Sequence, residues 1–306
     1  MSKAEILHGT VVRAYGKYFD VALHRSERIL LCTPKGLLKR ERKGTDLVAV
    51  GDRVQVIDVG EDEGRIEVVE PRRSVLARLA RKTRDTEQVL VANPDLALFV
   101  FSAREPEPNP RMLDRFLALA ESRNLPAAIA VNKSELVPPG ATPVFAEHRP
   151  LYKTYDISVR TGLGIEELLA DLDGKITVLA GPSGVGKSSF VNTINPGRNQ
   201  LVTEVSESTG KGKHTTTAAQ LFLIGPQTFV ADTPGIRALA LQGVDPVDLP
   251  ECFPEFRDHL GHCRFNDCTH LQEPDCAILH AVEAGQIGPG RYGSYASLRR
   301  GDGDES

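Results

Sequence analysis

The segment GPSGVGKSS, from Gly181 to Ser189, largely decides the fold of this chain. It contains the pattern G-x4-G-K-S, and the apolar run KITVLAG before it predicts a strand, while the residues after it predict a helix. Glycines allow backbone N–H groups to surround phosphates, and the start of a helix favours negative charge. The expected phosphate-binding residues are Gly181, Pro182, Ser183, Gly184, Val185, Gly186, Lys187, Ser188 and Ser189.

Within this loop, Lys187 is expected to reach the β and γ phosphates as a catalytic cation, and Ser188 is expected to bind Mg²⁺. A carboxylate for the same Mg²⁺ should follow a buried strand, and Asp232 ends the segment TFVAD. Gly235, in the turn DTPG, is placed to give its backbone N–H to the γ-phosphate. The sequence therefore predicts a nucleoside triphosphate site with Mg²⁺.

The base-reading residues are predicted from the segment NKSE, which comprises Asn132, Lys133, Ser134 and Glu135. It resembles the guanine-reading Asn-Lys-x-Asp motif of GTPases, with glutamate in the last position. A carboxylate accepts two hydrogen bonds from guanine that adenine does not offer. The segment ISVRTGLGI, residues 157–165, resembles the Ser-Ala-x-x-Gly-x-Gly segment that backs the base, with Val159 in place of alanine.

The first seventy residues contain five short β segments and no helical pattern, which predicts a small barrel: GTVVRAYG, YFDVALH, RILLCT, DRVQVIDV and RIEVVE. The barrel resembles an OB-fold, an architecture often used on oligonucleotides. Its aromatic and basic residues could contact RNA, or its aromatics could belong to the core: Tyr15, Lys17, Tyr18 and Phe19. From Asn93 onward, strand and helix patterns alternate, which predicts a mostly parallel sheet covered by helices.

Four of the five cysteines lie between Cys252 and Cys276, whereas Cys32 stands alone as an expected buried residue. The spacing C-x4-C-x-H-x5-C predicts one closed, structural Zn²⁺ site whose ligands are Cys263, Cys268, His270 and Cys276. We expect the metal to replace a core that about sixty C-terminal residues hardly build alone. Cys252, His259, His262 and His280 lie outside this spacing and are expected to bind no metal.

The composition is that of an ordinary folded protein, with 306 residues, 41% hydrophobic and 25% charged, and a net charge of −4. The longest apolar run, Leu96 to Phe101, is too short to span a bilayer, so we expect a cytoplasmic protein that binds no membrane. Locally, RRSVLARLARKTR from Arg72 to Arg84 carries six basic and no acidic residues. We expect it to be a connector, either solvated or in contact with phosphates; a second basic cluster comprises Lys35, Lys39, Arg40, Arg42 and Lys43.

The order of the motifs is diagnostic, because the base-reading segments at Asn132 and Ser158 precede the phosphate loop at Gly181 and the Asp232 turn. Ordinary GTPases have the reverse order. With its β domain before and its Cys/His motif after, the chain resembles the RsgA family of circularly permuted ribosome-assembly GTPases. The resemblance implies an OB-fold barrel in residues 1–85, an α/β P-loop GTPase domain in 86–245 and an α-rich zinc-binding domain in 246–306.

The family's loop Gly-Lys/Arg-x-x-His-Thr-Thr-Thr appears here as GKGKHTTT, from Gly210 to Thr217. By resemblance, this loop forms the first switch, in which we favour Thr216 among the three threonines as a further Mg²⁺ ligand. Ile236 occupies the place of the glutamine that orients water in many GTPases, so intrinsic hydrolysis should be slow. His214 is the best substitute, because an imidazole can orient a water, although a surface histidine is the alternative.

The resemblance implies a GTPase that binds the small ribosomal subunit through rRNA, assists its late maturation and hydrolyses GTP to GDP when stimulated by that subunit. No sequence feature demands a dimer, so a monomer is expected. Two alternatives remain at this point. One is a kinase or ATPase whose flanking domains bind a substrate; the other is a zinc-containing RNA-binding protein whose nucleotide only stabilises the fold.

Overall fold

The computed structural model describes residues 5–36, 47–79, 87–138, 143–195, 220–232 and 244–301. The chain forms two compact units. The first comprises Met1–Leu96, Leu169–Leu179 and Ser188–Ile236, and the second comprises Ala97–Leu168, Ala180–Lys187 and Arg237–Ser306. Each unit is therefore assembled from segments far apart in the sequence.

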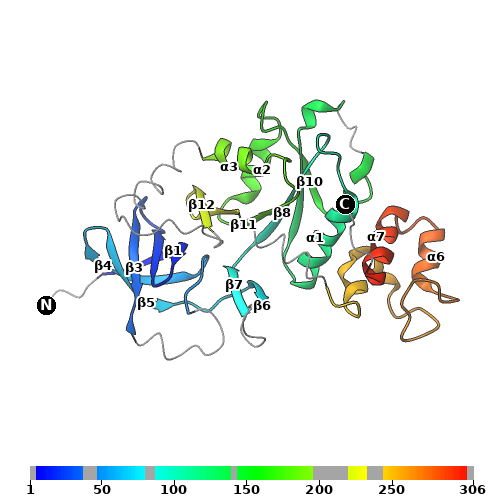
Figure 1. Cartoon of the computed structure of the whole chain (residues 1–306), viewed down its shortest axis with the longest axis horizontal. Helices are drawn as coiled ribbons and strands as arrows, with labels where there is room; N and C mark the ends of the chain where they lie inside the picture. The colour runs from blue at the N-terminus through cyan, green and yellow to red at the C-terminus, as the bar shows by residue number, and fades with distance from the viewer. Residues whose placement is uncertain are drawn as a thin grey trace. The chain divides into compact units, whose positions relative to one another are not determined.

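The first unit begins with a closed barrel of five strands in the order β1-β2-β3-β5-β4 (Figure 1). The strands are β1 (Ile6–Tyr15), β2 (Tyr18–Leu23), β3 (Ile29–Pro34), β4 (Arg53–Gly60) and β5 (Glu63–Val69). Alternate residues point inward and form a core that includes Val11, Val21, Leu30, Val56 and Ile66. Cys32 is fully buried in this core, as predicted, and burial raises the pKa of its thiol to about 12. The predicted barrel is confirmed.

The aromatic residues of β1 and β2 have different environments. Phe19 is a core residue, whereas Tyr18 is 41% exposed and carries the Lys17 ammonium 5.1 Å from its ring centroid. Tyr15 is half-buried and donates a hydrogen bond to Asp20. Burial and this bond raise the pKa of Tyr15 to about 12. Of the four aromatic and basic residues predicted on this barrel, only Tyr18 and Lys17 therefore offer an accessible pair.

The expected basic connector is partly a hairpin, which the sequence pattern did not predict. Strand β6 (Val75–Leu79) pairs antiparallel with β7 (Glu87–Ala92). The first two cations of the basic connector have partners. The Arg72 guanidinium bonds both oxygens of buried Asp52 at 2.7 and 2.8 Å, and Arg73 lies 3.0 Å from Asp95. Arg72 therefore serves the fold, whereas Arg73 forms an ion pair at the surface. Residues 80–84, like Lys39, Arg40, Arg42 and Lys43 of the second cluster, lie outside the described residues.

The remaining six strands form a sheet of order β10-β9-β8-β11-β13-β12, which confirms the predicted α/β architecture. They are β8 (Leu96–Ser102), β9 (Ala127–Asn132), β10 (Lys153–Asp156), β11 (Ile176–Ala180), β12 (Gln220–Gly225) and β13 (Thr228–Asp232). Strands β8, β9 and β10 are parallel to one another, as are β11 and β13, while β12 is antiparallel to β13. Strand β10 was not predicted, because the short sequence KTYD has little apolar character.

The helices between these strands are α1 (Pro110–Ser122), α2 (Ile165–Leu172) and α3 (Lys187–Ile194). Helix α1 begins at a local signal, since the side chain of Asn109 accepts a hydrogen bond from the backbone N–H of Met112 and proline occupies the first turn. Short 3-10 turns follow at η2 (Ser134–Leu136) and η3 (Pro143–Phe145). Within the described part of the chain, no helix has the length and apolar character needed to cross a membrane.

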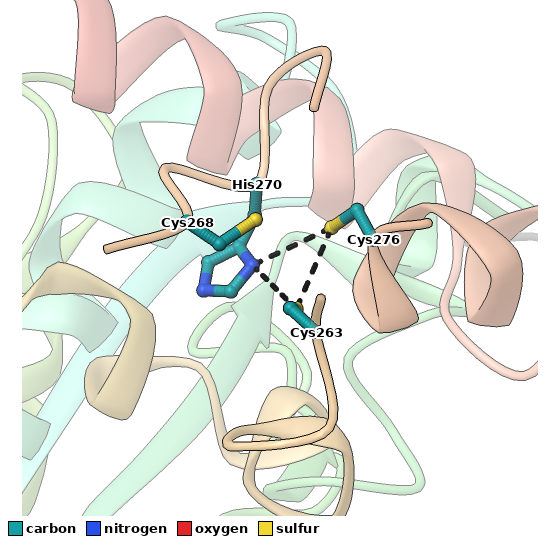
Figure 2. A group of neighbouring side chains, drawn as sticks. All are labelled: Cys263, Cys268, His270 and Cys276. Carbon is teal, nitrogen blue, oxygen red and sulfur yellow. Dashed lines mark hydrogen bonds between the residues drawn. The ribbon is translucent and has the colours of Figure 1, made fainter. Parts of the chain in front are cut away.

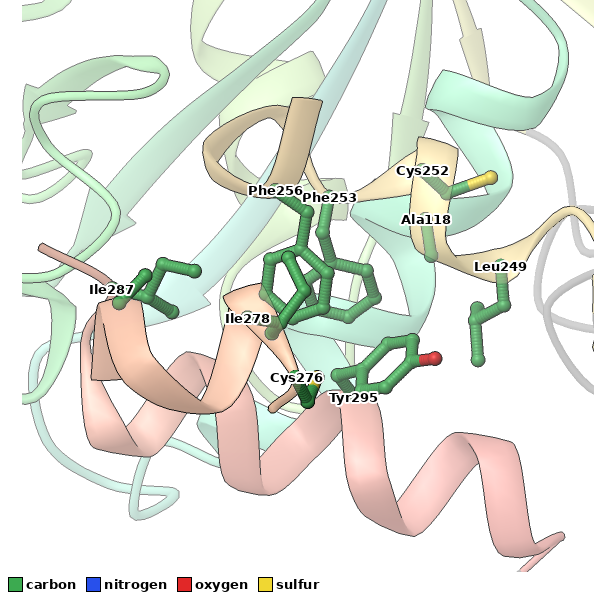
Figure 3. Close-up of a cluster of buried hydrophobic side chains, with 10 residues drawn as sticks. Ala118, Leu249, Cys252, Phe253, Phe256, Cys276, Ile278, Ile287 and Tyr295 are labelled. Atoms are coloured by element: carbon green, nitrogen blue, oxygen red, sulfur yellow. The ribbon is translucent and has the colours of Figure 1, made fainter. Parts of the chain in front are cut away.

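The C-terminal segment is α-rich, as predicted, with η4 (Leu249–Cys252), η5 (Pro254–His259), α6 (Ala277–Glu283) and α7 (Pro289–Arg300). It has an aromatic core of its own, in which the ring centroids of Phe256 and Tyr295 are 4.8 Å apart (Figure 3). Phe253 and Ile278 join this core, and Ala118 contributes to it from α1. This cluster is completed by Ala118 of α1 and also contains Cys276 of the predicted metal motif, so the segment does not build its core alone.

A buried ionic cluster joins this C-terminal segment to α1. The Arg291 guanidinium, 1% exposed, lies 2.5 Å from Asp114 of α1 and bonds Glu255 at 2.7 and 3.0 Å. It also lies 4.6 Å from the ring centroid of Phe253, and His148 bonds Asp114 at 2.6 Å. Two acidic side chains and an aromatic ring thus compensate the burial of one cation.

Burial would raise the pKa of Asp114, but the hydrogen bond from His148 and the charge of Arg291 outweigh it and hold this pKa below its ordinary value. A carboxylate whose folded pKa is depressed stabilises the fold above its unfolded pKa. That contribution is lost as the pH falls through the folded value. The attachment of α7 to α1 is therefore expected to weaken in acid.

We expect the substitution Arg291→Met to lower the free energy of unfolding by about 3–5 kcal/mol, because it leaves two buried carboxylates without their cation. Arg257→Met is the matched control, since Arg257 also joins the C-terminal segment to α1, through Glu121 at 2.6 Å, but is 52% exposed. It should cost at most about 1 kcal/mol. Urea unfolding followed by far-UV circular dichroism measures both. Equal losses would show that the buried cluster has no special role.

Candidate nucleotide site and metal centre

The phosphate loop connects the end of β11 to the start of α3, which is the placement that the pattern predicts. Gly181, Gly184 and Gly186 have φ values of 146°, 79° and 98°. A Cβ on Gly181 would lie 2.0 Å from the carbonyl oxygen of Val100. The loop conformation thus requires glycine both for its backbone angles and for close packing against β8.

The side chains of the phosphate loop differ in their exposure to solvent. Val185 is buried, whereas Ser183, Ser188 and Ser189 are exposed and Pro182 is half-buried. The Lys187 ammonium folds back over the loop and donates to the carbonyl oxygens of Gly181 at 2.9 Å and Pro182 at 2.5 Å. A phosphate has the charge to draw this ammonium away from neutral carbonyls. The cation is therefore held close to the place where phosphates are expected.

Asn132 connects the phosphate loop to both base-reading segments. It ends β9 and is 3% exposed. Its side-chain Nδ2 donates to the carbonyl oxygen of Val185 at 2.8 Å, and its Oδ1 accepts from the backbone N–H of Val159 at 3.1 Å. A Cβ on Gly186 would lie 2.4 Å from that Nδ2. One amide thus brings together three segments that the sequence marked separately.

The residues after Asn132 turn sharply out of the strand. Lys133 has a left-handed backbone with φ 61°, and its ammonium donates to the carbonyl oxygen of Glu105. The backbone N–H of Ser134 donates to Ile157 at 3.1 Å, and its hydroxyl donates to Val131 at 2.8 Å. Ser134 therefore holds the NKSE segment against the end of β9 and the start of the ISVRTGLGI segment.

Glu135 is held by two residues of the base-backing segment. Ser158, which is fully buried, gives it a side-chain hydrogen bond, and Arg160 Nε lies 3.3 Å from its Oε1. The hydrogen bond from Ser158 is the main cause that keeps the pKa of Glu135 below its ordinary value, so the carboxylate is charged at neutral pH. Its Oε2 is buried without a hydrogen-bond partner among the described residues. Oε2 of Glu135 is thus an acceptor that is enclosed by the protein and has no donor among the described residues.

Arg160 is the residue of this site that sequence reasoning missed. No nucleotide-binding motif marks its position, and an exposed arginine in a glycine-containing loop resembles any solvated residue. Its position two residues after Ser158, in the segment that meets Glu135, was the available signal.

The Mg²⁺ and switch predictions are only partly within the described structure. Asp232 ends β13, where it pairs with Leu179 of parallel β11, one residue before β11 ends. The strand that leads to the phosphate loop and the strand that carries Asp232 therefore end side by side. Five residues predicted for the Mg²⁺ shell, the γ-phosphate and the attacking water lie outside the described residues: His214, Thr215, Thr216, Thr217 and Gly235.

The four residues of the cysteine and histidine motif converge as predicted (Figure 2). All ligand atoms of Cys263, Cys268, His270 and Cys276 lie within 4.8 Å of one another. His270 Nδ1 is 3.5 Å from each of two sulfurs, those of Cys263 and Cys276, which are 3.8 Å apart. Four soft ligands in this arrangement form a closed site that could hold a metal ion.

The other cysteine and histidine residues of the tail stay apart from this cluster. Among the described residues, the cluster contains only the four predicted ligands. Cys252 is buried, its thiol donates to the carbonyl oxygen of Asp248 at 3.4 Å, and burial raises its pKa to about 11. Cys252 is therefore an apolar core residue, as Figure 3 shows.

Comparison with known proteins agrees with this geometry. The sequence profile of the RsgA GTPase family matches residues 69–242. A small ribosomal subunit biogenesis GTPase RsgA of Gemmatimonas aurantiaca is 42% identical over 295 residues, covering 95% of this chain and 96% of that protein. The protein of the same name from Moorella thermoacetica is 38% identical, covering 95% and 96%.

Two solved structures share the fold. The crystal structure of YjeQ from Thermotoga maritima is 32% identical, covers 97% of this chain and 98% of that chain, and gives a TM-score of 0.77. The structure of YloQ, described as a circularly permuted GTPase, is 26% identical with a TM-score of 0.74, covering 97% and 95%. The similarity thus extends over the barrel, the sheet and the C-terminal segment.

We expect Gly186→Ala to weaken nucleotide binding by about 5- to 150-fold, which corresponds to about 1–3 kcal/mol of strain. The added methyl group would collide with the Asn132 amide that joins the loop to the base-reading segments. Gly174→Ala is the control, because Gly174 also has a positive φ, of 68°, but no atom lies within 4 Å of the position that its added methyl group would take. Titration with a fluorescent GDP analogue measures both affinities. An unchanged affinity in Gly186→Ala would contradict this account of the loop.

Proposed function

The chain belongs to the RsgA GTPase family, and from this premise we propose that it hydrolyses GTP to GDP and phosphate while bound to the small ribosomal subunit, whose late maturation it assists. The observation that carries the proposal is the Asn132 amide, which bonds the phosphate loop and the base-backing segment together. This contact supports one shared site for a base and its phosphates, although the segments occur in permuted order. Kinases and other P-loop enzymes do not require the NKSE segment in that place.

Guanine selectivity is assigned to Glu135. Its stem is longer than that of the usual aspartate, and the hydrogen bond from Ser158 together with the ion pair to Arg160 limits the positions that the longer stem can take. The two oxygens of a charged carboxylate suit the two N–H groups on one edge of guanine, provided that the side chain turns its buried Oε2 toward the base. Adenine presents no such pair, so an ATP-using enzyme is disfavoured.

For the reaction, we assign Ser188, Asp232 and Thr216 to the Mg²⁺ ion that accompanies GTP. Lys187 is assigned to the β and γ phosphates, and His214 to the attacking water. Mg²⁺ would neutralise charge that develops on the phosphates. With Ile236 in place of a water-orienting glutamine, the site on its own lacks one element of catalysis. Stimulation by the ribosomal subunit would supply what is missing.

The metal of the C-terminal cluster is assigned as one Zn²⁺. In a tetrahedral site with Zn–S bonds of about 2.3 Å, neighbouring sulfurs should be about 3.8 Å apart. Cys263 and Cys276 show this separation, 3.8 Å. Because all four positions are taken by side chains, the ion would be structural and would contribute no step to GTP hydrolysis.

The proposed partner is the rRNA of the small subunit. Tyr18 and Lys17, exposed on the barrel, offer a stacking surface and a cation that suit an unpaired nucleotide. We infer a cytoplasmic enzyme, because ribosome assembly takes place in that compartment. We infer a monomer, because no sequence feature demands a dimer. An RNA-binding protein whose nucleotide serves only the fold would not turn over GTP repeatedly.

The decisive experiment measures GTP turnover with and without purified small ribosomal subunits. We expect turnover to rise by about tenfold or more with subunits, because Ile236 stands where many GTPases have a water-orienting glutamine and hydrolysis without the subunit should be slow. The variant His214→Ala should bind GTP normally and lose the stimulated turnover. Turnover of ATP at the same rate would identify a general P-loop enzyme instead, and stimulation that survives in His214→Ala would remove that residue from the mechanism.

A second experiment tests the base reader. Glu135→Gln replaces an acceptor with a donor that faces the guanine amino group, so we expect GTP affinity to fall by about 5- to 150-fold, or 1–3 kcal/mol. Xanthine nucleotides carry a carbonyl in place of that amino group and should regain affinity in the same variant. Arg160→Gln keeps the carboxylate and removes only its ion pair, so it should lower GTP affinity less than Glu135→Gln and should not favour xanthine nucleotides. If Glu135→Gln bound neither GTP nor the xanthine nucleotide, the assignment of Glu135 as the base reader would be refuted.

A further inference from the structure

The metal ligands lie on a loop with an unusual backbone. Between Cys263 and Cys276, His270 and Asp275 both have left-handed conformations, with φ values of 59° and 57°. Such conformations are uncommon outside glycine, although histidine and aspartate adopt them more readily than most residues, and the surroundings help to hold them. The segment Cys268–Cys276, termed the ligand loop, therefore needs side chains that hold it in this shape.

Glu273 occupies the centre of the ligand loop. One carboxylate oxygen, Oε1, accepts the backbone N–H of Thr269 at 2.7 Å and the hydroxyl of the same residue. The other, Oε2, accepts the backbone N–H groups of Leu271 at 3.0 Å and Gln272 at 3.1 Å. Four donors from three positions around His270 thus converge on one side chain.

These hydrogen bonds determine the direction in which the pKa of Glu273 is shifted. Partial burial alone would raise the pKa of Glu273, but the hydrogen bonds from Thr269 and from backbone N–H groups lower it to about 2. A carboxylate that accepts several backbone N–H groups strongly favours its charged form. The turn around His270 is therefore closed by charge-assisted hydrogen bonds rather than by chain conformation alone.

Helix α7 holds the other side of the same turn. The hydroxyl of Tyr295 donates to the carbonyl oxygen of Thr269 at 2.8 Å, and that of Tyr292 donates to the carbonyl oxygen of His270 at 3.0 Å. Glu273 thus binds the N–H groups of the turn while α7 binds its carbonyl groups. Tyr295 belongs to the aromatic core in Figure 3, which also contains the ligand Cys276, so the ligand loop is packed directly against that core.

We propose that Glu273 is a positioning residue that shapes the ligand loop for metal binding, so that it controls how long the metal is retained. The inference rests on the proposed Zn²⁺ site. Glu273 touches no ligand atom; it acts through the backbone of Thr269, Leu271 and Gln272, which flank His270. The aromatic core keeps the C-terminal segment folded when the metal leaves, whereas the carboxylate sets the geometry of the ligands.

The test compares metal release from Glu273→Gln with release from wild type and from Asp275→Asn. The amide is isosteric but loses the charge and one acceptor, and we expect zinc transfer to a chromogenic chelator to be about 10- to 100-fold faster. Asp275→Asn makes the same charge change in the same loop, at a residue that is 62% exposed and paired with Arg264 in a surface contact of 3.1 Å. It should release zinc at the wild-type rate.

Binding of Co²⁺ provides a second measurement, because a tetrahedral site with thiolates has a distinctive visible spectrum. Glu273→Gln should bind Co²⁺ more weakly than wild type, while far-UV circular dichroism and affinity for a GDP analogue stay unchanged. Glu273→Asp keeps the charge but is too short to reach all four donors, so its release rate should be intermediate. It also serves as the test variant if Glu273→Gln does not fold.

Release from both Glu273 variants at the rate of Asp275→Asn would overturn the inference while leaving the zinc site intact. A wild-type protein that binds neither Zn²⁺ nor Co²⁺ would overturn the zinc site and the role of Glu273 with it. Faster release from Glu273→Gln together with loss of nucleotide binding would also contradict the inference, because the effect would then be general unfolding. The GTPase assignment is independent of all three outcomes.

Discussion

The two hydrogen bonds of the Asn132 amide are the constraint on which the nucleotide site depends. A buried amide needs partners for both its donor and its acceptor, and here those partners are the Val185 carbonyl of the phosphate loop and the Val159 N–H of the base-backing segment. Any shift of one segment would leave a buried polar group unpaired. This requirement fixes the phosphate loop against the segment at Val159, whatever the order in which the chain supplies the two.

That independence explains how a permuted chain can build a GTPase site. The base-reading residues follow strand β9, the phosphate loop follows β11 and Asp232 ends β13, and all three strands are members of one sheet. In a parallel sheet, the carboxyl ends of the strands lie along one edge, where ligands commonly bind. The order of strands in the sheet, rather than their order in the chain, decides which of the predicted site residues are neighbours.

The C-terminal segment uses two different means to stay in place. Towards α1, it buries Arg291 between two carboxylates, an arrangement that stabilises strongly only while every partner is present. Towards the metal cluster, the carboxylate of Glu273 and the hydroxyls of Tyr292 and Tyr295 hold the ligand loop. Helix α7 takes part in both, so the attachment to α1 and the support of the ligands share one element.

The sequence by itself determined the barrel, the alternating α/β unit, the phosphate loop and the cluster of three cysteines and one histidine that could hold a metal ion, because each leaves a local pattern of spacing or periodicity. It did not reveal the β6–β7 hairpin, strand β10, the contact between Arg160 and Glu135, or the hydrogen bonds that converge on Glu273. Asp114 and Arg291 are 177 positions apart, and no periodic pattern marks such a pair. Only the tertiary structure decided these features, since which polar groups lose water, and which distant partner replaces it, depends on how the chain packs.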